Sequence, residues 1–305
     1  MKFNWEGVMP AVTTQFNSND ELDLDMFKVN IQAQLAAGVN GIVLGGTLGE
    51  ASTLTEDEGR KLTRETVAIV AGKIPVLMNI AEQTTKAAIA LAKSAKEDGA
   101  SGLMMLPPMR YKASDAEIVH YFKSVANSTS LPIMIYNNPV DYKLVVTLDM
   151  FQELLEACPN IQAVKESTRD TTNITRIKNR FGNRLAIMTG VDTLALESLV
   201  LGADGWVAGL VDAFPAETVA IYKLVKAGKV QEAITIYRWF MPLLELDIHP
   251  KLVQYIKMAS VHTGIGNEYV RAPRLVLEGG ERSRIEKVIT DALAIRPTLP
   301  DYKNL

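Results

Sequence analysis

The sequence contains few of the residues on which several large classes of protein depend. Cys158 is the only cysteine in 305 residues, which excludes an intrachain disulfide and fits a reducing compartment. The three histidines, His120, His249 and His262, have no companions at the spacing of metal ligands, so a catalytic zinc is not expected. A nucleophile elbow and a dinucleotide-binding fingerprint are also missing. We therefore expect neither a metal nor an organic cofactor.

Charge and hydropathy exclude two further classes of partner. The formal net charge is −3, so there is no positive excess to attract nucleic acid or an anionic membrane. No apolar run approaches the ~20 residues of a membrane-spanning helix. The opening stretch, MKFNWEGVMP, has no basic region followed by an apolar one, so a signal peptide is not indicated. We expect a soluble, cytoplasmic protein.

Short apolar segments alternate with helical patterns through the first 228 residues. Eight segments are expected to form strands, beginning near Val8, Gly41, Pro75, Gly102, Pro132, Ile161, Leu185 and Gly205. Helical periodicity follows each of them, over residues 25–37, 55–71, 84–97, 115–127, 147–157, 174–180, 193–201 and 215–227. Near-continuous apolar strands that alternate with helices are typical of a parallel sheet buried on both faces. Eight such units in about 220 residues predict an α/β fold, a (β/α)8 TIM barrel over residues 1–228.

Only helical patterns are found after residue 228. They cover residues 230–246, 250–263 and 282–294. No low-complexity tract or flexible linker separates them from the barrel. We therefore expect residues 229–305 to form a C-terminal helical extension packed on the barrel.

Two side chains at the ends of expected strands have the chemistry of a catalytic pair. Lys165 lies near the end of the sixth strand, where burial would lower its pKa and free the amine to attack a carbonyl or imine carbon. Tyr136 lies at the end of the fifth strand, which is next to the sixth in a barrel, so its phenol can move protons beside that amine. Taken singly, the lysine could reach water and the tyrosine could serve packing alone. Their convergence at one end of a barrel favours catalysis.

Glycine-rich segments at other strand ends can accommodate a substrate. Residues 45–50, GGTLGE, can present backbone N–H groups to a carboxylate, although such a turn can also serve connectivity alone. The ends of the seventh and eighth strands, at Gly190 and around Val207, leave room beside Lys165. They could equally fill the taper of the barrel.

Three motifs occur in order: Gly46-Thr47-x-Gly49-Glu50, Tyr136-Asn137-x-Pro139 and Val164-Lys165-Glu166. Together they resemble the dihydrodipicolinate synthase and N-acetylneuraminate lyase family, and the resemblance covers essentially the whole chain. It implies a barrel, usually a homotetramer, and Schiff-base catalysis on a small 2-oxo acid or related imine. It also implies roles for individual residues: the Schiff base at Lys165, proton relay at Tyr136, carboxylate binding at Thr47 and the Leu48 backbone, and a backbone contact at Val207. Gly46 and Gly190, at the same strand ends, are further candidates to bind the substrate.

Three positions depart from the synthase pattern. Leu48 replaces the second hydroxyl residue of the turn. Met109 occupies the place of a relay tyrosine after the fourth strand, and Tyr111, two positions later, is a candidate to replace it. Asp141 stands where the synthase has an arginine near the carboxylate of its second substrate, and an anion there would repel such a partner.

Several stretches are similar instead to a branch found in hydroxyproline catabolism: residues 81–85, 136–140, 205–211, 252–257 and 270–274. That resemblance implies deamination of 1-pyrroline-4-hydroxy-2-carboxylate to 2-oxoglutarate semialdehyde. Glu82 and Asp141 are then candidates to contact the substrate hydroxyl or ring nitrogen, and Met109 lies in a specificity loop. Alternatives are dihydrodipicolinate synthase, another 2-keto-3-deoxy sugar acid aldolase or dehydratase, and a catalytically silent metabolite-binding protein. A metal-dependent aldolase is opposed by the few histidines.

Overall fold

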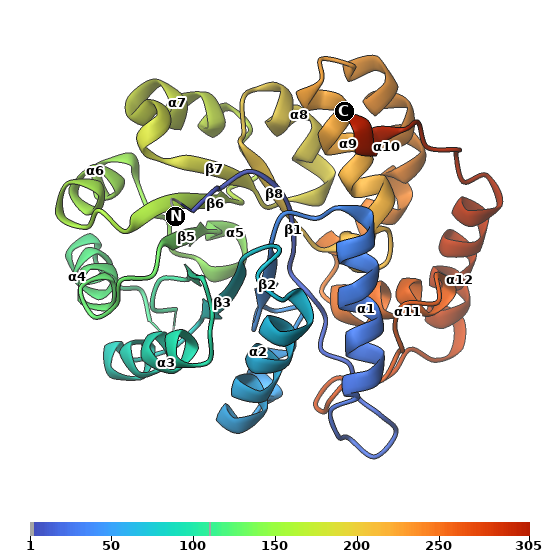
Figure 1. Ribbon diagram of the computed structural model, residues 1–305, viewed down its shortest axis with the longest axis horizontal. Helices are drawn as coiled ribbons and strands as arrows, with labels where there is room; N and C mark the ends of the chain where they lie inside the picture. Colours follow the sequence, from blue (N-terminus) through green and yellow to red (C-terminus); the bar gives the residue numbers. More distant parts are fainter. Residues whose placement is uncertain (1–2, 110) are drawn as a thin grey trace.

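The computed structural model describes residues 3–109 and 111–305, and a parallel eight-stranded sheet rolled into a barrel lies at its centre (Figure 1). Neighbouring strands follow the order β1-β8-β7-β6-β5-β4-β3-β2. A parallel bridge between Ala11 and Val43 joins the two ends of this order. The predicted (β/α)8 barrel is therefore confirmed. The strands are β1 (Gly7–Pro10), β2 (Ile42–Leu44), β3 (Val76–Ile80), β4 (Gly102–Met105), β5 (Ile133–Asn137), β6 (Ile161–Glu166), β7 (Ala186–Thr189) and β8 (Gly205–Ala208).

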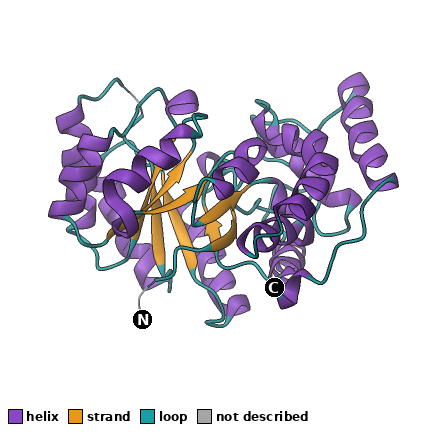
Figure 2. Ribbon diagram, turned by 90° about the horizontal axis from the view of Figure 1, so that it is seen from above, coloured by secondary structure: helices purple, strands orange, loops and turns teal. Residues whose placement is uncertain are grey.

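Helices surround the strands (Figure 2), and their ends carry local stop and start signals. Thr55 and Glu58 form a capping box at the start of α2, which satisfies backbone donors that the first turn leaves free. Gly38 ends α1 in the left-handed conformation, with φ of 92°. The helices that follow the strands are α1 (Leu24–Ala37), α2 (Glu56–Val70), α3 (Thr85–Glu97), α4 (Asp115–Ala126), α6 (Leu148–Ala157), α7 (Thr172–Phe181), α8 (Ala195–Val200) and α9 (Pro215–Lys226).

One short helix, α5 (Pro139–Tyr142), was not predicted. It forms because the Asn138 side chain accepts a hydrogen bond from the Asp141 N–H at 3.2 Å and because proline suits the first helical position. This single turn folds the loop after β5 back on itself. As a result, the Tyr142 ring packs edge-on against Tyr136, with ring centroids 5.7 Å apart.

The C-terminal quarter consists of helices packed beside the barrel, as predicted. They are α10 (Val230–Leu244), α11 (Leu252–His262) and α12 (Gly279–Ala294). The helix expected over residues 230–246 is wrong at its end, because a short 3-10 turn, η5 (Glu245–Ile248), follows α10. This turn contacts η3 (Asp192–Leu194), which follows β7. The C-terminal region therefore reaches the end of the barrel where the strands finish.

Apolar side chains fill the barrel and the layer between strands and helices. Every residue of β1, β2, β3, β4 and β8 is buried, as expected for parallel strands covered on both faces. In the described part of the chain, no helix has both the length and the apolar character needed to cross a membrane.

Candidate active site

A cavity of about 1070 Å³ opens at the carboxyl ends of the strands. Apart from Tyr111, the residues that the sequence predicts to form a site all line this cavity. Those residues are Lys165, Tyr136, Gly46, Thr47, Leu48, Gly190, Val207, Asp141, Glu82 and Met109. Tyr142, Asp247 and His249 also line the cavity, although the sequence had not indicated them as site residues.

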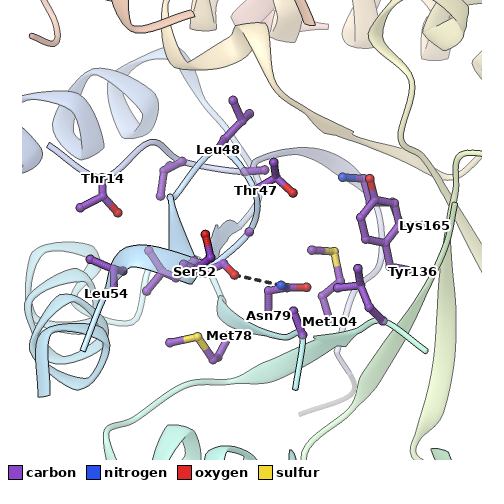
Figure 3. Close-up of a pocket in the computed structure, with 18 of the residues that line it drawn as sticks. Thr14, Thr47, Leu48, Ser52, Leu54, Met78, Asn79, Met104, Tyr136 and Lys165 are labelled. Carbon is purple, nitrogen blue, oxygen red and sulfur yellow. Dashed lines mark hydrogen bonds between the residues drawn. The ribbon is translucent and has the colours of Figure 1, made fainter. Parts of the chain in front are cut away.

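Lys165 and Tyr136 lie next to each other, as predicted. They are register partners on the paired strands β6 and β5. The Lys165 side chain is directed over the tyrosine ring, with its Nζ 4.1 Å from the ring centroid (Figure 3). Lys165 is only 7% exposed. The amine is thus enclosed by the barrel yet borders the cavity.

The charge state of Lys165 follows from this position. Among the described residues, its amine has no hydrogen-bond or ion-pair partner. Burial lowers the pKa of Lys165, and this outweighs the opposing influence of Tyr142, Asp247 and Asp192. A lowered pKa increases the fraction of neutral amine, the form that attacks a carbonyl or imine carbon.

Gly190 is required by the path of the lysine side chain. A Cβ at this position would lie 2.6 Å from Lys165 Cε and 2.3 Å from Ser167 Oγ. Its backbone N–H donates to the Glu166 carbonyl at 2.9 Å, which holds the end of β7 against β6. Glycine here leaves the space through which Lys165 reaches the cavity.

Tyr136 is joined to the rim by a short network. The Asn138 side-chain amide donates to the Tyr136 hydroxyl at 3.1 Å and to Asp141 Oδ2 at 2.7 Å. Asp141 Oδ1 lies 3.9 Å from the Arg169 guanidinium. Burial raises the pKa of Tyr136 to about 12. The phenol therefore remains protonated at neutral pH and can donate a proton to a reacting group.

The turn after β2 forms the facing wall. The Asn79 side-chain amide donates to the Gly45 carbonyl at 2.9 Å and fixes the start of the turn (Figure 3). Thr47 Oγ1 lies 3.1 Å from the Tyr142 hydroxyl. The Leu48 side chain is buried and packs towards Gly209, at the end of β8.

Asp247 enters the cavity from η5. A Cβ at Gly209 would lie 2.2 Å from Asp247 Oδ1, so the carboxyl group packs directly on the end of β8. Burial raises the pKa of Asp247 well above its ordinary value, with the Asp192 charge adding to this. Strand periodicity could not have revealed this residue, because it lies in the helical region about 80 residues after the lysine in sequence.

Tyr111 does not line the cavity of its own chain. It is 53% exposed, so within one chain it does not replace the relay tyrosine missing at Met109. Glu82 and Met109 border the cavity from the loops after β3 and β4. Tyr142 was not predicted as a site residue. The signal for it in the sequence is the Asn-Pro helix start that precedes it, because this start places Tyr142 in a helical turn only six residues after Tyr136.

A barrel in which a buried, unpaired lysine lies beside a phenol at the carboxyl ends of the strands has the site of a class I Schiff-base enzyme. Comparison with known families agrees with this class. Residues 4–292 match the Dihydrodipicolinate synthetase family. The chain belongs to this family and is a lysine Schiff-base lyase.

Similar proteins are found by sequence and by structure. The 4-hydroxy-tetrahydrodipicolinate synthase of Exiguobacterium sibiricum is 33% identical over 276 residues, covering 90% of this chain and 92% of that protein. The synthase of Methanoculleus marisnigri is 30% identical, covering 94% and 99%. The solved synthase of Methylacidiphilum fumariolicum SolV superposes with a TM-score of 0.90 at 27% identity, covering 95% of this chain and 97% of that one.

Proposed function

We propose that this Schiff-base lyase acts on a small cyclic 2-imino carboxylate and deaminates 1-pyrroline-4-hydroxy-2-carboxylate. The observation that carries the proposal is the acidic mouth of the cavity. Asp141 stands where the synthase pattern has an arginine, and its carboxylate is held by the Asn138 amide at 2.7 Å. Asp247 adds a second carboxyl group from the C-terminal region. An anion at Asp141 disfavours a second substrate that must be held by its own carboxylate.

The proposed substrate has one carboxylate, which would rest on the backbone of the turn at Gly46, Thr47 and Leu48. The neutral amine of Lys165 would attack the ring C=N carbon, and Tyr136 would supply and recover protons. Elimination of the ring hydroxyl as water, followed by hydrolysis at two C=N bonds, gives 2-oxoglutarate semialdehyde and ammonia. Overall, one water molecule is consumed for each substrate.

Three further residues complete the proposed binding site. Glu82 and Asp141 are placed to accept hydrogen bonds from the ring hydroxyl or a protonated ring nitrogen, since both line the cavity. Met109 gives an apolar surface to the carbon side of a small ring. Gly190 and Val207 leave the space in which the ring would lie beside Lys165.

The second candidate is 4-hydroxy-tetrahydrodipicolinate synthase, which condenses two substrates at the same lysine. The names of the relatives described above favour this activity over the deaminase. Against it stand Asp141 in the arginine position and the missing hydroxyl at Leu48. Arg169 is a nearby cation, but it already lies 3.9 Å from Asp141.

One experiment separates the two candidates. The purified protein is incubated with 1-pyrroline-4-hydroxy-2-carboxylate alone, and separately with pyruvate and aspartate semialdehyde together. Ammonia and semialdehyde from the first incubation support the deaminase, with Lys165→Ala as the inactive control. Consumption of pyruvate only when the aldehyde is present would overturn it in favour of the synthase. Ligand binding with no turnover in any incubation would favour a metabolite-binding protein.

The quaternary structure and the division of the chain are also proposals. The family resemblance supports a homotetramer, which light scattering of the purified protein tests. We further propose that residues 229–305 belong to the catalytic unit with residues 1–228, because Asp247 lines the cavity beside Lys165. Truncation after residue 228 should therefore abolish turnover.

A further inference from the structure

Tyr142 is a cavity residue to which the proposed reaction assigns no role. Its hydroxyl lies 3.1 Å from Thr47 Oγ1, within hydrogen-bond distance. Its ring packs edge-on against Tyr136, 5.7 Å between centroids. One phenol therefore contacts both the turn that would bind the substrate carboxylate and the tyrosine beneath the Schiff-base lysine.

We propose that Tyr142 is a catalytic residue that, together with Thr47, exchanges protons with the substrate while the Schiff base forms at Lys165. In sequence, hydroxyl groups are missing at Leu48 and at Met109. The fold supplies a hydroxyl group from a third position, Tyr142 at the end of α5. This inference rests on the Schiff-base chemistry of the family and holds for either candidate substrate.

Hydrogen bonding supports this role for Tyr142. The Tyr136 hydroxyl accepts from the Asn138 amide at 3.1 Å. Among the described residues, the Thr47 hydroxyl is bonded to Tyr142 and not to Tyr136. A proton path from the turn thus leads to Tyr142 first. Because α5 belongs to the same chain, this path needs no residue from a second subunit.

Electrostatics also place Tyr142 beside the reacting centre. An ionised Tyr142 would raise the pKa of the Lys165 amine, an effect second only to that of burial. Burial raises the pKa of Tyr142 itself to about 12. The phenol is protonated at neutral pH, and the cation that forms on the lysine nitrogen during reaction would favour its ionisation.

The proton transfers balance without an external acid or oxidant. With a 2-oxo acid, the lysine nitrogen bonds to the carbonyl carbon and its proton passes to the oxygen, giving a neutral carbinolamine. The Tyr142 hydroxyl then protonates the carbinolamine oxygen, the C–O bond breaks, and water leaves as the nitrogen lone pair completes an iminium cation. The phenolate recovers a proton from the adjacent substrate carbon when the iminium becomes an enamine. With a ring imine, the ring nitrogen takes the place of the leaving oxygen.

The test is the rate of covalent trapping. Tyr142→Phe retains the ring and removes only the hydroxyl. Borohydride trapping is followed by mass against time, with pyruvate and with 1-pyrroline-4-hydroxy-2-carboxylate as separate probes. We expect the trapping rate to fall by about 10²–10⁴-fold, the contribution typical of a positioned acid or base. The added mass should still be found on Lys165.

A matched control is Tyr222→Phe. Tyr222 is also a buried tyrosine whose pKa is raised to about 12, but its hydroxyl accepts from the Gly7 N–H at the start of β1, at 3.0 Å. This variant should be trapped at the rate of the unmodified protein. Thr47→Val, which keeps the backbone of the turn, should slow trapping. Adding it to Tyr142→Phe should slow trapping little further if the two hydroxyls act as a unit.

The outcomes distinguish this inference from the proposed function. An unchanged trapping rate in Tyr142→Phe would overturn the catalytic role of Tyr142 and leave the proposed function standing, with Tyr136 as the relay. A slower rate explained by an equal loss of affinity for the probe would also overturn it, since that indicates a binding role. An unmodified chain that traps neither probe would overturn both proposals together.

Discussion

Two lysines of the described chain are almost completely buried, and they differ in what surrounds the amine. Lys257, on α11, is 0% exposed, and its Nζ donates to Glu50 Oε1 at 2.8 Å and to the Tyr269 carbonyl. Lys165, on β6, is 7% exposed and lies over the Tyr136 ring without such a partner among the described residues. Burial lowers the pKa of both, and Glu50 opposes this at Lys257.

This difference separates a structural lysine from a reactive one. The Lys257–Glu50 pair links the turn after β2 to the C-terminal helices, and Glu50 also accepts from the Arg271 N–H at 3.0 Å. The Lys257 amine thus has its hydrogen-bond partners within the fold. The Lys165 amine borders the cavity and has no such partner among the described residues. A buried amine is stable when paired and reactive when unpaired, and the described residues include one of each.

The largest effect should come from removing the reactive amine. Lys165→Ala should reduce turnover to the uncatalysed background and abolish the mass that borohydride adds with a 2-oxo or 2-imino carboxylate, because Lys165 supplies the buried amine beside Tyr136 in the cavity. The fold should be unaffected, as checked by circular dichroism. If the variant were labelled to the same extent as the unmodified protein, Lys165 would not form the Schiff base and the contrast with Lys257 would disappear.

The second effect concerns stability instead of activity. Lys257→Met should lower the free energy of unfolding by about 3–5 kcal/mol, because it leaves the Glu50 carboxylate buried without its cation. Urea denaturation measures the change. The double variant Lys257→Met with Glu50→Gln should recover part of the loss, since it removes the uncompensated charge. A Lys257→Met variant as stable as the unmodified protein would show that Arg274, 3.7 Å from Glu50, supplies enough positive charge alone.

The contrast between the two lysines could be predicted only in part from the sequence. The barrel, the strand that bears Lys165 and its proximity to Tyr136 all follow from a local alternation of strands and helices, which the sequence shows directly. The partner of Lys257 could not be predicted, because Glu50 is 207 positions away and meets it only in the folded chain.

Two residues of the site, Asp247 and Tyr142, were also not predicted from the sequence. Asp247 lies on the turn η5 between the helices α10 and α11, where no periodic sequence pattern indicates a cavity. Tyr142 is aimed by the four-residue helix α5, which is too short for helical periodicity to reveal. The roles given to the predicted site residues remain predictions, although the fold places all of them around one cavity.

The third effect depends on the glycine beside the reactive lysine. Gly190→Ala should lower kcat/KM by about 10²-fold, because the added methyl group would displace Lys165 by around an ångström. Steady-state kinetics measure the loss. Gly280→Ala, at the start of α12, is the matched control, since a Cβ there meets no atom within 4 Å. Full activity in Gly190→Ala would mean that the lysine side chain has room to move aside without losing its alignment.

The smallest effect is a gain in stability. The pKa of Lys165 is lowered in the folded protein from its ordinary value of 10.5, so between these two pKa values the unfolded chain binds more protons and stability rises with pH. Below both values the buried charge destabilises the fold in full. Lys165→Met should therefore raise the free energy of unfolding at pH 7 by roughly 0.5–2 kcal/mol, with the gain shrinking towards pH 10.5. Urea denaturation at pH 7 and pH 10 measures this, and Lys257→Met should change stability in the opposite direction. A Lys165→Met variant less stable at pH 7 would show that Asp192 and Asp247 already stabilise a charged Lys165, which would make the two lysines alike.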